Sequence, residues 1–211
     1  MRFWSILRLH RHVTKNIEVA ESFVRETRRA QKLHHPNVTS PLEMGLDDGE
    51  VFVVSDYVEG ETLAVLLAAA GPEGVPVPVM LRIATDVLEA LSAAHRLEPQ
   101  PLVHGEISPW SIHVGRDGVA RLSGFGVAGA LSRIGLHGIK GYERLSYAAP
   151  ERVDAMMAPA SSAPRALDPR SDLFSIAVVL WESIARQKLF ASRIEAAVAQ
   201  KVASAPIAPL N

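Results

Sequence analysis

The sequence predicts an α+β protein of two parts: a small mixed lobe over residues 1–59 and a larger, mainly helical lobe over residues 60–211. Two observations predict this fold class. The hydrophobic patterns run in the order strand, helix, two strands and then mostly helices. The hydrophobic pattern of the sequence changes around Gly60, where strand-like segments are followed by longer apolar segments with helical spacing. A chain of 211 residues, 48% of them hydrophobic, is also long enough to bury a core.

The small lobe begins with the apolar and aromatic segment FWSILRL at residues 3–9, which predicts a strand. Apolar residues at helical spacing follow, and they predict a helix that ends before Pro36. Two further strands are predicted over residues 38–46 and 51–57. The Asp-Asp-Gly sequence at residues 47–49 is typical of a hairpin turn between them.

The larger lobe is predicted to contain three helices, over residues 62–70, 79–96 and 172–186, with Ser171 as the cap of the last one. Short strand-like segments lie between residues 101 and 128. Glycine-, alanine- and proline-containing segments predict two loops and a frayed tail, at residues 129–146, 155–167 and 203–211.

Composition and charge exclude several classes of protein. The balance of 22 basic against 23 acidic residues argues against binding to nucleic acid. The absence of cysteine excludes disulfides and thiolate metal sites. No apolar run is long enough for a membrane span and no signal-peptide pattern occurs, so we expect a cytoplasmic protein. The histidine pairs at residues 10 and 12 and at 34 and 35 lack a nearby carboxylate, so no metal site is predicted.

Five segments occur in the order and spacing of one known family. They are SFVRETRRAQKLHHPNV at 22–38, VFVVSDYVEGETL at 51–63, LVHGEISPWSIHVGRDGVARLSGFGVA at 102–128, SYAAPERV at 146–153 and DPRSDLFSIAVVLWE at 168–182. On these motifs, residues 3–192 resemble a Hanks-type (eukaryotic-like) serine/threonine protein kinase of bacteria. The resemblance implies a two-lobe kinase fold with a partial N-lobe, made of the third to fifth strands plus the αC helix, and an incomplete helical C-lobe. It implies truncation at both ends.

The resemblance also implies a role for each motif. The backbone of Asp56, Tyr57 and Val58 matches the hinge, which bonds adenine in the family. Other matched residues hold the kinase fold together, and these are Glu26, His104, Phe125, Gly126, Glu151 and Asp172. Among them, Asp172 matches the aspartate that braces the catalytic loop.

The phosphate-binding groups of the family are absent from the first lobe. Leu7 stands where the family has its phosphate-binding lysine, and no glycine-rich phosphate loop occurs before Glu26. Leucine cannot pair with the αC glutamate. We therefore expect Glu26 to form an ion pair with Arg29 or Lys32 of its own helix.

The catalytic and metal-binding groups of the second lobe are also replaced. His104-Gly105-Glu106 stands in place of the family's His-Arg-Asp, so Glu106 is a degenerate catalytic carboxylate that is one methylene longer. Ser108 replaces the loop lysine and Ser111 replaces the metal-binding asparagine. Gly124 replaces the aspartate that is the main ligand of Mg²⁺.

These replacements predict a catalytically inactive pseudokinase that acts in signalling by binding another protein, with no cofactor. Three alternatives stay open. The chain could be an atypical active serine/threonine kinase that uses Glu106, ATP and Mg²⁺. It could bind nucleotide through the hinge without transferring phosphate. It could also be a non-functional kinase fragment.

Overall fold

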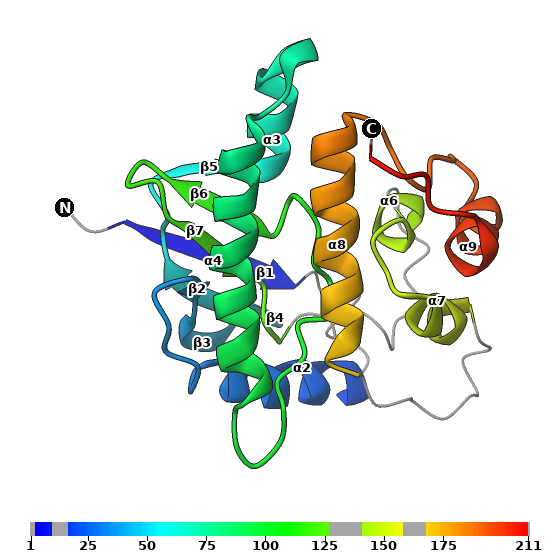
Figure 1. Cartoon of the computed structure of the whole chain (residues 1–211). Helices are drawn as coiled ribbons and strands as arrows, with labels where there is room; N and C mark the ends of the chain where they lie inside the picture. The colour runs from blue at the N-terminus through cyan, green and yellow to red at the C-terminus, as the bar shows by residue number, and fades with distance from the viewer. Residues whose placement is uncertain (1–2, 10–16, 127–140, 158–167, 211) are drawn as a thin grey trace.

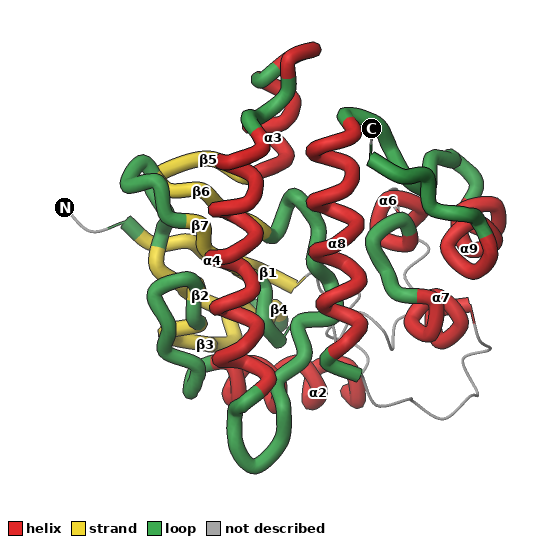
Figure 2. Tube along the Cα trace, viewed as in Figure 1, coloured by secondary structure: helices red, strands yellow, loops and turns green. Residues whose placement is uncertain are grey.

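The computed structural model describes residues 3–9, 17–126, 141–157 and 168–210 of the chain. The predicted two-lobe α+β fold is confirmed (Figure 1). Strands gather on one side of the molecule and most helices on the other (Figure 2). No helix in the described ranges is long and apolar enough to cross a membrane.

The first lobe is a three-stranded antiparallel sheet with one helix. Its strands, in the order β1-β4-β3, are Trp4–Leu9, Glu50–Asp56 and Pro41–Asp47. Helix α2, Ile17–Ala30, contacts this sheet through β3 and buries Phe23 against Val51 and Val53. The predicted hairpin turn is present, and Asp48 and Gly49 both have positive φ as such turns require.

The strand predicted over residues 38–46 is in fact two strands that belong to different sheets. Its first part, β2 at Val38–Thr39, runs parallel to β7 at Ala120–Ser123. The backbone changes direction at Ser40, whose hydroxyl donates to the carbonyl of Leu33. Strand β2 thereby joins the second sheet, in the order β2-β7-β6-β5, in which β6 is Ile112–Gly115 and β5 is Gly60–Thr62.

The second lobe is built around two long helices, α4 at Val77–His95 and α8 at Arg170–Ala185, which lie side by side (Figure 1). Both bury apolar residues in the main core, among them Val87, Leu91 and Val179. The other helices are α3 at Leu63–Ala69, a 3₁₀ turn at Gly71–Glu73, α6 at Gly141–Leu145, α7 at Pro150–Met157 and α9 at Glu195–Ser204.

Four sequence predictions need correction. Residues 101–105 were expected to be strand-like but are irregular, because the backbone N–H groups of His104 and Gly105 donate to a buried carboxylate instead of a strand. Ser171 is not the cap of α8, which begins one residue earlier. Helix α9 was not predicted and takes in the start of the predicted tail. The loop predicted over residues 129–146 contains α6, and the loop predicted over residues 155–167 contains the end of α7. Residues 129–140 and 158–167 of these predicted loops lie outside the described residues.

Candidate functional site

One buried carboxylate, that of Asp172 in α8, fixes the loop over residues 102–111. It accepts hydrogen bonds from the backbone N–H of His104 at 2.8 Å and of Gly105 at 2.7 Å, and from Nε2 of His95 at 2.8 Å. Asp172 has no solvent-exposed surface. A carboxylate is tolerated in such a place only when several donors replace its lost hydration. The geometry therefore gives Asp172 the bracing position that the motif implies.

The buried ring of His104 joins this loop to the Gly-Phe-Gly turn. Its Nε2 lies 2.8 Å from the carbonyl oxygen of Ser123, and its Nδ1 accepts from the backbone N–H of Glu106. These partners require the proton on Nε2. Burial lowers the pKa of His104, so the neutral ring is favoured. The ring also packs edge-on against Phe125, with 4.7 Å between the ring centroids.

The Gly-Phe-Gly turn also contacts the first lobe. A Cβ atom added at Gly126 would lie 2.9 Å from the backbone nitrogen of Thr27 in α2. Only glycine allows so close an approach of two backbones, and its φ of 89° favours glycine as well. Phe125 and Gly126 therefore have the structural positions that the resemblance implies.

Helix α2 is tied to the second lobe by Arg29, a residue that the sequence analysis placed only as a partner of Glu26. Its guanidinium forms an ion pair with Glu26 at 2.9 Å, one of the two pairings expected from the sequence. It also donates to the carbonyl oxygens of Gln100 and Pro101, both at 2.9 Å. Glu26 thus orients an arginine that bonds the loop after α4. Helical spacing predicted the first contact, but no sequence signal predicts the other two.

The carboxylate of Glu106 is enclosed by two arginines. Arg144 in α6 donates to both of its oxygens, at 2.9 and 2.6 Å, in a bidentate contact. Arg152 in α7 donates to Oε1 at 2.6 Å. The carboxylate is largely buried, and the side chain of Arg152 is only 5% exposed. Glu106 therefore holds α6 and α7 against the loop, an arrangement that the sequence analysis did not foresee.

The remaining replaced positions offer neither positive charge nor metal ligands. Leu7 lies on β1 opposite Val53 and is half-exposed. The hydroxyl of Ser111 donates to the carbonyl of Ser108 at 3.0 Å and accepts from its backbone N–H at 3.1 Å, so it stabilises a local turn. Gly124 has no side chain to offer. No cluster of three or more metal-ligating side chains occurs in the described part of the chain.

A cavity of about 240 Å³, here called the interlobe cavity, lies between the first sheet, α2 and the Gly124–Phe125 turn. The hinge residues Asp56, Tyr57 and Val58 line it, as does Leu7. No lysine or arginine is among the described residues that line it. The three phosphates of ATP need cations, and Mg²⁺ needs several hard oxygen ligands. The residues present therefore do not fit Mg²⁺-ATP.

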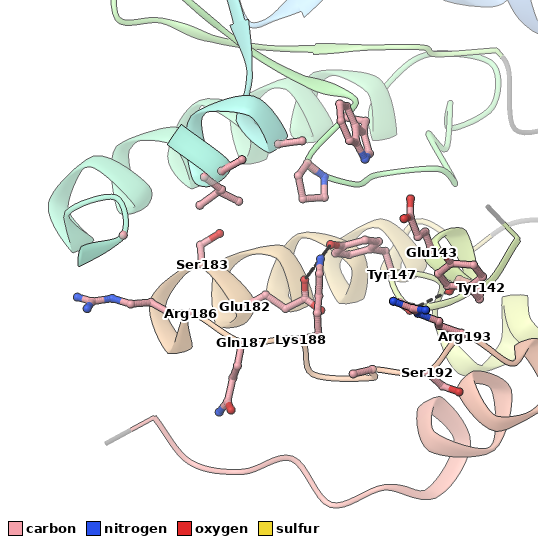
Figure 3. Close-up of a pocket in the computed structure, with 18 of the residues that line it drawn as sticks. Tyr142, Glu143, Tyr147, Glu182, Ser183, Arg186, Gln187, Lys188, Ser192 and Arg193 are labelled. Carbon is pink, nitrogen blue, oxygen red and sulfur yellow. Dashed lines mark hydrogen bonds and ion pairs between the residues drawn. The ribbon is translucent and has the colours of Figure 1, made fainter. Parts of the chain in front are cut away.

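A larger groove of about 780 Å³ lies between α3 on one side and α6 with the end of α8 on the other (Figure 3). Apolar and aromatic side chains form part of its wall, among them Leu67, Pro109, Trp110 and Tyr142. Trp110 is 54% exposed. This groove leaves no local signal in the sequence because its walls come from four separate segments, within residues 64–74, 109–110, 142–147 and 182–193.

A polar triad, in which Glu182 and Tyr147 are buried and Lys188 is exposed, forms one end of the groove. The hydroxyl of Tyr147 donates to Oε2 of Glu182 at 2.8 Å, and the ammonium of Lys188 donates to both, at 2.6 and 2.9 Å (Figure 3). The backbone N–H of Leu189 donates to the other Glu182 oxygen. Burial and the adjacent Glu182 raise the pKa of Tyr147, so its hydroxyl stays protonated. The triad fixes the segment after α8 against α6.

Glu151, to which the resemblance gives a structural role, is exposed at the start of α7. Its neighbour Arg152 is the buried charged residue of this segment. The expectation for Glu151 needs correction, because α7 turns the arginine inward, towards Glu106, and leaves the glutamate facing solvent.

Comparisons with known proteins agree with this geometry. The sequence signature of the family described as "Protein kinase domain" matches residues 6–208. The tyrosine-protein kinase MasK of Myxococcus xanthus is 30% identical over 211 residues, which cover 97% of this chain and 31% of MasK. The serine/threonine-protein kinase PrkC of Bacillus subtilis is 30% identical over 166 residues, 78% of this chain and 24% of PrkC. The chain spans less than a third of the length of either relative.

Solved structures share the fold. The kinase domain of PknI from Mycobacterium tuberculosis matches with a TM-score of 0.70 and 24% sequence identity. The match covers 95% of this chain and 72% of the PknI chain. At this identity the likeness concerns the fold alone.

Replacing Glu106 tests its role as a structural anion. In Glu106→Gln, the buried guanidinium of Arg152 and that of Arg144 lose their counter-charge, so the free energy of unfolding should fall by about 3–5 kcal/mol. Urea denaturation measures this loss. Glu151→Gln, an exposed change of the same chemistry on α7, serves as the control and should shift stability by less than about 0.5 kcal/mol. Equal effects of the two substitutions would contradict the assigned role.

The buried neutral ring of His104 predicts that stability falls in mild acid. Its pKa is lowered in the folded chain, whereas an unfolded histidine takes up a proton below about pH 6.5. The unfolded state then binds more protons, so the free energy of unfolding falls as the pH drops through that value. Burial lowers the pKa of His113 in the same direction. Melting temperatures between pH 7.5 and 5.5 should fall less steeply in His104→Gln than in the unsubstituted chain, and parallel curves would contradict the prediction.

Proposed function

This chain belongs to the protein kinase domain family, with bacterial serine/threonine kinases among its relatives, and from that premise we propose that it is a pseudokinase: it binds another protein and does not transfer phosphate. The observation that carries the proposal is the pair of arginines on Glu106. The fold is retained while the group best placed to act as a base serves to hold the structure together.

A general base needs a carboxylate oxygen free to approach the hydroxyl whose proton it takes, at about 2.6–3.2 Å. Arg144 contacts both oxygens of Glu106, and Arg152 contacts one of them as well. Freeing an oxygen would break a charge-assisted contact in a largely buried cluster. This cost supports a structural rather than a catalytic use of the residue.

The uncharged positions around the interlobe cavity give further support. Leu7 and Gly124 stand where phosphoryl transfer needs a cation and a metal ligand, and the hydroxyl of Ser111 is used within its own turn. Loss of one stabilising group in a transition state costs about 3–4 kcal/mol, which is a factor of roughly 10²–10³ in rate. Several such losses on one site leave little transfer to measure.

The groove beside α3 supports the protein-binding half of the proposal. Its volume of about 780 Å³ is large enough for several side chains of an extended segment. Its wall combines exposed apolar surface at Trp110 with polar groups from Arg186 and Arg193. Aromatic residues and arginine are the residue types enriched where proteins bind one another.

A phosphotransfer assay tests the catalytic half. With ATP and either Mg²⁺ or Mn²⁺, we expect no more phosphate on the chain or on a generic protein substrate than in a protein-free control. Glu106→Gln should give the same background, because the carboxylate does not act as a base. Transfer above background that disappears in Glu106→Gln would overturn the proposal.

A single residue of the groove wall tests the protein-binding half. Ala68 is exposed on α3 and lines the groove, whereas the next residue, Ala69, is exposed and does not line it. Peptides selected from a random display library on the unsubstituted chain should bind Ala68→Arg at least tenfold more weakly, because the new side chain fills the groove. Ala69→Arg is the matched control and should bind them unchanged.

Two outcomes would contradict this half of the proposal. Selection that enriches no peptide would leave the groove without a protein ligand. Peptides that bind both arginine variants equally would place binding elsewhere on the chain.

A further inference from the structure

Helix α4 carries an exposed strip of apolar side chains on the side next to α8. Val77, Leu81 and Leu88 in this strip are 46%, 50% and 43% exposed. His95 follows Leu88 by seven residues, and its ring contacts Asp172 of α8. Because residues seven apart lie on nearly the same side of a helix, the strip lies on the side of α4 that adjoins α8.

Helix α8 continues this apolar surface. Leu173 is 45% exposed, Ala177 is exposed and Leu180 is partly exposed. The sequence of α8 from Leu173 to Trp181, LFSIAVVLW, is apolar except for one serine. A helix that is apolar on all sides is typical of a buried position. The two helices lie side by side at the front of the molecule in Figure 1, so these side chains and the strip form one surface, here called the α4–α8 face.

The α4–α8 face is large enough for a specific interface. The 19 residues of α4 span about 28 Å, and two packed helices are about 20 Å wide. The face therefore covers roughly 500–600 Å² in projection. Burying it on two copies would remove slightly more than about 1,000 Å² of surface, which is the lower limit for a specific contact between proteins.

Two opposite charges border the strip on the side away from α8. Arg82 and Glu89 are both exposed and are seven residues apart. Nε of Arg82 donates to Asp86 at 3.0 Å, and the other oxygen of Asp86 accepts from the backbone N–H of Ala120 in β7. This border therefore lies towards the second sheet. The guanidinium of Arg82 has further donors for another carboxylate.

The leucines and the charges are arranged symmetrically about Thr85. Leu81 precedes Thr85 by four residues and Leu88 follows it by three, whereas Arg82 precedes it by three and Glu89 follows it by four. When α4 lies antiparallel to α4 of a second copy, with a two-fold axis near Thr85, each Leu81 therefore meets Leu88 of the other copy. Each Arg82 then faces Glu89 of the other copy. A two-fold interface requires this kind of self-complementarity.

We propose that two copies of this chain associate through their α4–α8 faces, with the α4 helices antiparallel about a two-fold axis near Thr85. Burial of the apolar strip supplies the affinity, and the contacts between Arg82 and Glu89 set the register. None of the residues that define the face lines the groove beside α3. The inference is therefore independent of the protein binding proposed for that groove.

Sedimentation velocity of the full chain at pH 7.5, from about 1 to 100 μM, tests the association. We expect a species of twice the chain mass of 22.8 kDa at the upper concentrations. In Leu88→Lys the dissociation constant of the dimer should rise at least tenfold, because each copy would bury an unpaired ammonium. Leu46→Lys, which changes an exposed leucine on β3, is the matched control and should leave the dissociation constant unchanged.

Disulfide trapping tests the position of the two-fold axis, because the chain contains no cysteine. Thr85→Cys places a thiol of each copy near the axis, so mild oxidation should link two copies. Ser204→Cys on α9 is the matched control. Both residues are exposed, and the hydroxyl of each donates to a carbonyl four residues earlier in its helix. The control should form far less linked dimer.

Three outcomes would overturn the inference. A chain that stays monomeric at 100 μM would do so and would leave the pseudokinase proposal intact. A dimer that Leu88→Lys and Leu46→Lys weaken equally would place the contact elsewhere on the chain. Equal disulfide formation in Thr85→Cys and Ser204→Cys would contradict a two-fold axis near Thr85.

Discussion

The carboxylate of Asp172 is the contact on which the arrangement of the second lobe depends. Three donors from two segments converge on it: the backbone of His104 and Gly105 and the ring of His95. Removed from water and fully bonded, such a group constrains every segment that reaches it. His104 in turn forms a hydrogen bond with the carbonyl oxygen of Ser123, so the position of the adjacent Gly-Phe-Gly turn is fixed as well. The loop geometry is thus set by α8, independently of any catalytic group.

The two lobes are joined by contacts that need neither nucleotide nor metal. Gly126 lets the turn of the second lobe meet the backbone of Thr27, and Arg29 extends from α2 to the carbonyls of Gln100 and Pro101. Glu26 orients Arg29 from one turn earlier in the helix. The lobes are therefore held together from within the chain, although Leu7 cannot pair with Glu26. These contacts hold α2 in place without a lysine at residue 7.

Glu106, which the resemblance matches to a catalytic carboxylate, has structural contacts in this chain. Arg144 and Arg152 use its charge to hold α6 and α7 against the loop. Such a cluster is stable only while all of its charges are present, since a buried charge without its partner is costly. The same requirement keeps both oxygens of the carboxylate bonded. The two arginine contacts thus account for the buried negative charge of Glu106.

The sequence by itself determined the family, the two-lobe order and the framework positions of His104, Phe125, Gly126 and Asp172, because these features reside in local motifs and periodic patterns. The tertiary structure alone decided which distant side chains meet. Arg144 and Arg152 lie 38 and 46 residues from Glu106, and the carbonyl partners of Arg29 lie 71 and 72 residues away. Periodicity encodes which face of a helix is buried, not what it is buried against. For the same reason the groove beside α3 left no signal in the sequence.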